Sequence, residues 1–182
     1  MFNKLCIIGV GLIGGSVAKA ARANGLAKTI VGYGREQDTV NLQTAKRLGV
    51  IDEFYIDNVG WVSDSVTQQD SQVASSYAKA NPTYEVVEHR TQQNTNIAEA
   101  LKDADCVLIA TPVASIEAIF TQLKPFWSDN TIYTDVGSTK SSVLAAAERV
   151  FGFIPDNLVA AHPIAGAKQN RAMSMEKVLL IC

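Results

Sequence analysis

A run of closely spaced glycines, Gly9-Val10-Gly11-Leu12-Ile13-Gly14, is the clearest chemical feature of this sequence. It follows a short apolar stretch and precedes an alanine-rich one, so it lies where a strand gives way to a helix. Gly9 allows a tight turn, Gly11 lets the backbone approach a pyrophosphate, and Gly14 lets the helix pack close to the sheet. N–H groups at the helix start, where Leu12 and Ile13 lie, then bind the phosphates. The run predicts a dinucleotide-binding site.

The end of the second expected strand selects between the nicotinamide dinucleotides. An acidic residue is usual about 20 residues beyond the glycine run, because its carboxylate accepts hydrogen bonds from the ribose hydroxyl of NAD. This sequence has Gly34 there, followed by Arg35. A guanidinium can bind a 2′-phosphate through two parallel hydrogen bonds, so the pair predicts NADP as the preferred cofactor over NAD. In the alternative, Arg35 is a solvated residue at a helix start and Glu36 holds the ribose.

Polar residues also follow three later strand patterns, at Thr111-Pro112, Gly137-Ser138 and His162-Pro163. Open α/β sheets bind ligands at the carboxyl ends of their strands, so these segments should converge beside the cofactor. Thr111 and Pro112 are expected to line the cofactor site. From its position alone, His162 is interpreted as a strand-end histidine whose ring hydrogen-bonds to the backbone. Lys140 can equally be a residue of a helix N-terminus that is exposed to water.

The elements that must position these residues alternate between strands and helices. Short continuous apolar runs are typical of strands buried on both faces of a parallel sheet. The expected strands cover residues 5–10, 29–33, 105–110, 131–136 and 158–161, and the expected helices cover residues 16–24, 36–48, 97–101, 115–123 and 141–151. This order predicts an α/β fold with a doubly wound, mostly parallel, Rossmann-like sheet and right-handed crossovers.

One stretch, from about residue 57 to 96, interrupts this alternation. It is rich in Ser, Gln, Thr and Asn, and a polar insertion in a surface connection is the simplest interpretation. Residues 84–87 could form a short edge strand within it. His89, a single histidine among polar residues, is expected to be solvated. A functional lid is an alternative that none of these residues supports.

Composition narrows the class of partner. The chain has 182 residues, 47% of them hydrophobic, and a formal net charge of −2, which suits one well-buried domain. Basic and acidic residues balance without blocks of like charge, so a small molecule is expected as partner, with no nucleic acid and no membrane. The sequence has neither a membrane-length apolar run nor a signal-peptide pattern, which predicts a cytoplasmic protein. Cys6, Cys106 and Cys182 have no metal-ligand spacing, so we expect reduced thiols and no metal site.

Three segments in the second half resemble the prephenate/arogenate dehydrogenase family of tyrosine biosynthesis. They are Cys-Val-Leu-Ile-Ala-Thr-Pro-Val at 106–113, Thr-Asp-Val-Gly-Ser-Thr-Lys at 134–140 and Ala-His-Pro-Ile-Ala-Gly at 161–166. Together with the glycine run, the resemblance covers residues 1–56 and 97–166 and implies the N-terminal nucleotide-binding domain of such an enzyme. It implies oxidative decarboxylation of prephenate or arogenate with NADP or NAD. It also implies that His162 accepts the proton of the substrate hydroxyl, while Ser138 hydrogen-bonds that hydroxyl or orients the imidazole and nicotinamide.

The sequence departs from the family after Gly166. Members normally continue with an acidic loop containing Ser-Gly and then with a helical domain that dimerises and binds the substrate carboxylates. Residues 167–182 match that loop poorly, although 177–181 could form one more strand, and no helical domain follows. We therefore expect a dinucleotide-binding domain at 1–166 with a divergent tail, incomplete as a catalyst alone. Two alternatives are another NADP-dependent reductase or dehydrogenase, acting on a small hydroxy acid or an imine, and a non-catalytic nucleotide-binding module.

Overall fold

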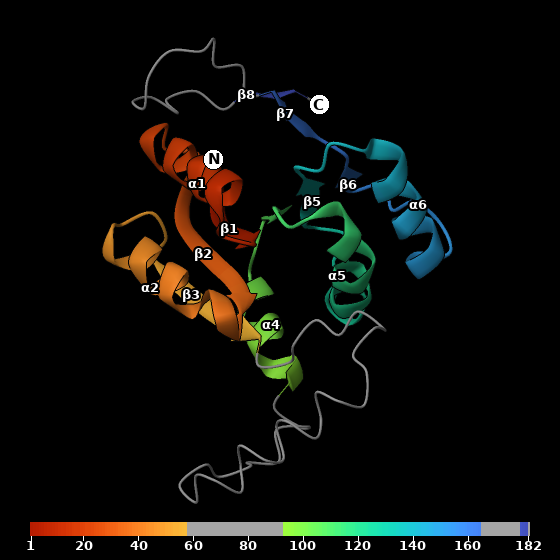
Figure 1. Cartoon of the computed structure of the whole chain (residues 1–182). Helices are drawn as coiled ribbons and strands as arrows, with labels where there is room; N and C mark the ends of the chain where they lie inside the picture. The colour runs from red at the N-terminus through yellow and green to blue at the C-terminus, as the bar shows by residue number, and fades with distance from the viewer. Residues whose placement is uncertain (58–92, 165–178, 182) are drawn as a thin grey trace, which may run out of the picture.

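The computed structural model describes residues 1–57, 93–164 and 179–181, and its main sheet lies between two layers of helices (Figure 1). The strands are β1 Phe2–Ile8, β2 Ala27–Arg35, β3 Glu53–Asp57, β4 Cys106–Ile109, β5 Ile132–Asp135, β6 Leu158–Val159, β7 His162–Ile164 and β8 Leu179–Ile181. The α-helices are α1 Leu12–Ala23, α2 Thr39–Arg47, α4 Gln93–Leu101, α5 Ile116–Leu123 and α6 Lys140–Phe151.

The main sheet has six strands in the order β3-β2-β1-β4-β5-β6, and every neighbouring pair is parallel. The chain moves outward from β1 in both directions, which confirms the predicted doubly wound, Rossmann-like architecture. β1 lies between β2 and β4, so the direction of winding reverses between β1 and β4. In an open parallel sheet that reversal leaves a crevice at the carboxyl ends of the strands, where ligands bind. β7 and β8 form a separate antiparallel pair.

Alternating side chains of the strands divide the core into two clusters. On one face, Leu5 and Ile7 of β1 lie in a cluster with buried residues of α1 and α2. On the other face, Cys6 and Ile8 lie in a cluster with residues of α4, α5 and α6. β1 is apolar on both faces and lies inside the sheet between β2 and β4, so the glycine run that follows it begins at the middle of the sheet.

Several boundaries differ from the sequence-based expectation. α1 begins at Leu12, inside the glycine run, where the sequence predicts a start at residue 16. β3 is a strand that the sequence pattern does not predict, since its central residues are only half-buried. β6 ends at Val159, two residues short of the expected end, and β8 falls inside the strand expected at 177–181. The possible edge strand at 84–87 and His89 lie outside the described residues.

Within the described residues, no helix combines the length and the apolar composition that a membrane crossing requires.

Candidate functional site

The glycine run forms a turn that side chains would block. Gly9 has φ +91°, and a Cβ there would lie 2.8 Å from the carbonyl oxygen of Ala110. A Cβ on Gly14 would lie 2.2 Å from the carbonyl oxygen of Gly9, so the first turn of α1 can approach the end of β1 only when residue 14 is glycine. A Cβ on Gly11 would meet nothing within 4 Å. Gly9 and Gly14 are therefore needed for the fold of the turn, and Gly11 leaves open space for a ligand.

The start of α1 is chemically open. The first N–H groups of any α-helix lack an intrahelical acceptor. Here the N-cap residue is Gly11, which provides no side-chain cap for them. These N–H groups and the positive end of the helix dipole suit a phosphate. Leu12 and Ile13, predicted to bind cofactor, are 74% and 41% exposed, and their side chains do not line the cleft described next.

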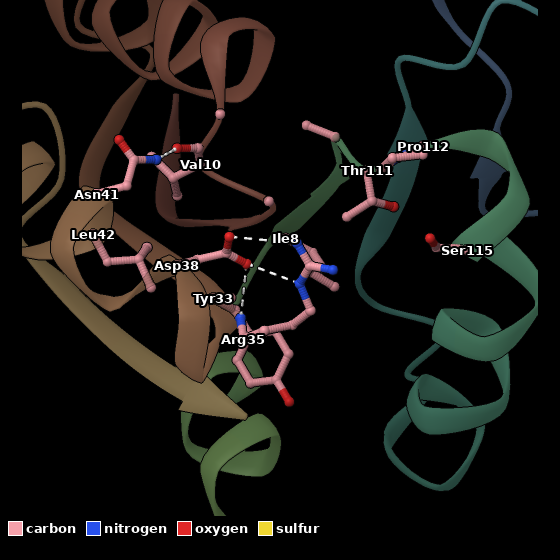
Figure 2. A pocket seen from close by; sticks show the side chains of 14 residues that line it. Ile8, Val10, Tyr33, Arg35, Asp38, Asn41, Leu42, Thr111, Pro112 and Ser115 are labelled. Atoms are coloured by element: carbon pink, nitrogen blue, oxygen red, sulfur yellow. Dashed lines mark hydrogen bonds and ion pairs between the residues drawn. The ribbon is translucent and has the colours of Figure 1, made fainter. Parts of the chain in front are cut away.

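A cleft of about 190 Å³ opens where β1, β2 and β4 end. Figure 2 shows Thr111, Pro112 and Ser115 on one wall and Asn41 and Leu42 on the opposite wall. The remaining lining comes from the chain after β1 and from the end of β2 and the turn that follows it; the full set is Ile8, Gly9, Val10, Gly11, Tyr33, Gly34, Arg35, Asp38, Asn41, Leu42, Ala110, Thr111, Pro112 and Ser115. Six of the nine predicted cofactor residues thus share one cleft.

One hydroxyl in this cleft is buried without a partner. The Oγ1 atom of Thr111 is inaccessible to solvent and makes no hydrogen bond to any described residue. A buried hydroxyl that is left unpaired costs free energy, and such atoms in native proteins commonly await a ligand or a water molecule. The free space at Gly11, the open helix start and this hydroxyl together fit the diphosphate and sugar of a dinucleotide.

At the end of β2, Arg35 is paired with an acid that sequence reasoning missed. Nε of Arg35 lies 3.0 Å from Oδ2 of Asp38, and Nη2 lies 3.4 Å from Oδ1. The backbone N–H of Arg35 also donates to Oδ2 of Asp38, at 3.1 Å. With its amide oxygen turned toward the guanidinium, Gln37 accepts from Nη1 at 2.7 Å. Figure 2 shows the Arg35–Asp38 pair inside the cleft.

Glu36, the acid considered from the sequence, does not line this cleft; it borders a separate surface depression with Arg35, Gln37 and Asp57. Asp38 is the acid that lines the cleft, because a short 3₁₀ turn over Glu36–Asp38 brings it back to the end of β2. The spacing alone does not identify Asp38, because the capping-box pattern begins with Ser or Thr and this sequence has Arg35 at that position.

Tyr33 adds a neutral hydroxyl to the floor of the cleft. Burial, with the nearby Asp57 carboxylate, raises the pKa of Tyr33 far above its ordinary value, and the two side chains are hydrogen-bonded. Asp57 is itself buried at the end of β3. Tyr33 therefore stays protonated and donates toward Asp57, so it contributes no charge to the site.

Ser138 and His162 lie outside the cleft, on the β5 side of the sheet. Ser138 is in the loop between β5 and α6, and His162 is the first residue of β7; both side chains are exposed. The sequence predicts His162 directly after a strand, but β6 ends at Val159 and His162 pairs instead with Ile181 of β8. Since β5 runs parallel to β4, the loop that bears Ser138 emerges at the sheet edge that also bears the cleft.

A buried carboxylate connects these two segments. Asp135, the last residue of β5, is fully buried, and its Oδ2 accepts the N–H of Gly137 at 2.7 Å. Its Oδ1 accepts the N–H of Ala161 at 3.2 Å. Nζ of Lys140 lies 2.9 Å from Oδ1 and 2.8 Å from Oδ2, and it also donates to the carbonyl oxygen of Ala161. Lys140 is therefore held in an ion pair, where the sequence equally allowed a residue exposed to water.

The model of the family described as prephenate dehydrogenase, nucleotide-binding domain, matches residues 66–180, which is more than half of the chain. That region includes the segments around Ser138 and His162, whereas the glycine run lies before it.

Relatives extend the similarity to the N-terminal part. The chain is 25% identical to a prephenate dehydrogenase of Lactococcus lactis over 58% of its length, and 25% identical to a cyclohexadienyl dehydrogenase of Zymomonas mobilis over 93%. It spans 34% and 43% of those two proteins. Among solved structures, a prephenate dehydrogenase from A. aeolicus, in complex with hydroxyphenyl propionate and NAD+, superposes with a TM-score of 0.61 at 24% identity. That match covers 93% of this chain and 44% of the other.

Proposed function

This chain belongs to the prephenate dehydrogenase family, as its nucleotide-binding domain, and we propose that it binds a nicotinamide dinucleotide and takes part in the oxidative decarboxylation of prephenate or arogenate. The chain spans less than half the length of the relatives it matches. The proposal therefore assigns the remaining substrate contacts, and the contacts of a dimer, to a helical domain of the kind with which members of the family normally continue. We also propose that the protein is located in the cytoplasm.

One observation carries this proposal: the carboxylate of Asp135 hydrogen-bonds both Gly137, which precedes Ser138, and Ala161, which precedes His162. Two segments far apart in the sequence are thereby joined at one edge of the sheet, the edge where the cofactor cleft opens. A hydroxyl and an imidazole on adjoining segments next to a dinucleotide site are the groups that oxidation of a substrate hydroxyl requires.

The residues proposed to hold the cofactor divide by the part of it that they meet. Gly9, Gly11 and Gly14, with the N–H groups of Leu12 and Ile13, would receive the pyrophosphate at the start of α1. The wall formed by Thr111 and Pro112 would meet the nicotinamide half, with the unpartnered Thr111 hydroxyl as a hydrogen-bonding group. Gly34 and Arg35 would meet the adenosine ribose.

The proposed chemistry needs one proton transfer, from the substrate hydroxyl to a residue of this chain. When bound, the nicotinamide supplies the hydride acceptor for the ring carbon that bears the substrate hydroxyl. His162, in its neutral form, accepts the proton of that hydroxyl. Ser138 hydrogen-bonds the same hydroxyl or orients the imidazole and the nicotinamide. Loss of carbon dioxide makes the ring aromatic, which drives the reaction toward product.

NADP is the proposed preferred form of the cofactor. The Arg35 and Asp38 side chains are 43% and 37% exposed, and an ion pair this exposed contributes about 0.2–1 kcal/mol. A 2′-phosphate, with a charge near −2, forms stronger charge-assisted hydrogen bonds to a guanidinium and can displace the carboxylate. Gly34 offers no carboxylate of its own that would repel the phosphate.

Titration of the chain with NADP and with NAD tests the cofactor half of the proposal. NADP is expected to bind with the lower Kd. Equal or tighter binding of NAD would refute the preference, and binding of neither would refute the nucleotide site itself.

Turnover tests the catalytic half. Reduction of NADP and NAD, dependent on prephenate or on arogenate, is measured with this chain and with a version extended by a helical C-terminal domain. Activity is expected only in the extended form. There, His162→Asn should lower turnover by about 10²- to 10⁴-fold and leave nucleotide affinity nearly intact. Unchanged turnover would remove His162 from the mechanism, and nucleotide binding with activity in neither form would support a non-catalytic module.

A further inference from the structure

The backbone of Ala161, the residue before His162, is held by side chains, because the pairing of β6 with β5 ends before it. β6 has only two residues, and its pairing with β5 ends where Thr134 faces Val159. Beyond that point, both backbone groups of Ala161 are bound by side chains. Asp135 accepts its N–H at 3.2 Å, and Lys140 donates to its carbonyl oxygen. Since Ala161 is 2% exposed, water cannot replace these bonds.

The same two side chains hold the loop that carries Ser138. Oδ2 of Asp135 accepts the N–H of Gly137, and Lys140 begins α6 two residues after Ser138. A side chain at position 137 would crowd this anchor, because a Cβ on Gly137 would lie 2.9 Å from Oδ2 of Asp135 and 3.0 Å from Cγ2 of Val113. The Asp135–Lys140 pair is thus a common anchor for both segments.

We propose that Asp135 and Lys140 are positioning residues that fix the backbone of His162 relative to that of Ser138. Asp135 is fully buried, so it remains an effective anchor only while a cation compensates its charge, and Lys140 supplies that cation at 2.8 Å. Neither side chain needs to touch a substrate for this role. The catalytic meaning of the anchor rests on the proposed function, whereas the positioning itself can be measured without turnover.

The test uses the ring signals of His162 in NMR spectra of the full chain. The sequence contains two histidines, His89 and His162, so the spectrum of His162→Asn assigns both. Lys140→Met removes the cation and the bond to Ala161, and the ring signals of His162 are expected to shift or broaden. Lys124→Met is the matched control, because Nζ of Lys124 also donates to a backbone carbonyl, that of Val150 at 2.7 Å. It should leave His162 unchanged.

Lys140→Arg provides a second variant that keeps the cation, in case Lys140→Met does not fold. Its longer, planar head group cannot reproduce both contacts of the ammonium, so a smaller shift of the His162 signals is expected. Wild-type His162 signals in a folded variant of either kind would overturn the proposal. So would an equal shift in Lys124→Met, because the signals would then report only general loosening.

Kinetics supply an independent readout. In an extended form that turns over substrate, Lys140→Met should lower kcat by about a hundredfold with the nucleotide Kd unchanged, the effect expected of a displaced catalytic group. A rise in the nucleotide Kd with kcat unchanged would overturn the positioning role. Failure of the unmodified chain to bind nucleotide would instead count against the proposed function and would not affect the NMR result.

Discussion

Replacing Asp38 with asparagine is expected to tighten NADP binding about tenfold while leaving NAD binding unchanged or weaker. Asp38 lines the cleft proposed to hold the cofactor and binds the guanidinium of Arg35, with Nε and Oδ2 3.0 Å apart. A 2′-phosphate on that guanidinium would share it with the carboxylate or displace it. In both cases the carboxylate opposes the phosphate, and asparagine keeps the size of the side chain while removing its charge.

The magnitude follows from the geometry and exposure of this pair. Two anions that contact one guanidinium lie about 5 Å apart, and the phosphate has a charge near −2. Because the Asp38 and Arg35 side chains are 37% and 43% exposed, the dielectric constant of water is the appropriate limit. The repulsion is then about 1.5 kcal/mol, which corresponds to roughly tenfold in Kd. NAD has no such phosphate, so it loses only a potential acceptor for its ribose hydroxyls.

Calorimetric titration of both nucleotides at low and physiological salt measures the effect. The gain for NADP should shrink as salt rises, since the Debye length falls to about 8 Å at 0.15 M. Asp52→Asn is the matched control, because Asp52 pairs with Arg22 at 2.8 Å and is 38% exposed but does not line the cleft. An unchanged ratio of NADP to NAD affinity in Asp38→Asn, or an equal change in Asp52→Asn, would refute the reasoning.

Two further predictions concern buried groups. Thr111→Val removes an unpartnered hydroxyl, so it should leave the free protein as stable or more stable and weaken nucleotide binding about two- to tenfold. Thr131→Val loses a 2.8 Å hydrogen bond to a carbonyl oxygen and should only lower the melting temperature. Weaker nucleotide binding in Thr131→Val alone would contradict this assignment. Burial raises the pKa of Cys6 to about 12 and that of Cys106 to about 11. In a Cys182→Ser variant, a thiolate-selective reagent should therefore react with neither cysteine until the protein unfolds or the pH rises toward those values. Rapid labelling of the native protein at pH 7 would contradict this prediction.

The order of elements could be predicted from sequence because each buried parallel strand is a short apolar run. β1, β2, β4 and β5 all follow that rule, and the six-stranded parallel sheet confirms it. β3 was missed because it is an edge strand, in which Phe54, Tyr55 and Ile56 are only half-buried. These three residues do not show the alternation of apolar and polar side chains that predicts a strand. The start of α1 was predicted too late because two glycines lie in its first turn, and glycine lowers helix propensity although packing here overrides it.

The features of the candidate site likewise divide into those that the sequence could predict and those that it could not. Glycine spacing is a local signal with a steric cause, and it placed the turn correctly, since a Cβ on Gly9 or Gly14 would collide with backbone atoms. The partners of Arg35 and Lys140 could not be read from spacing. Asp38 reaches the cleft through a 3₁₀ turn whose register the residues do not reveal, and Asp135 meets Ala161 only because β5 and β6 are neighbours in the sheet.

The two ion pairs of this region have opposite environments, and this difference determines what each can do. Arg35 and Asp38 are both well exposed, so water compensates either charge when the pair opens, and a phosphate can take the place of the carboxylate at small cost. Asp135 is fully buried and Lys140 is 30% exposed, so opening that pair would leave an uncompensated buried charge, which costs about 3–5 kcal/mol. The exposed pair is therefore suited to exchange partners with a ligand. The buried pair is suited to keep the segments of Ser138 and His162 in one arrangement while that exchange takes place.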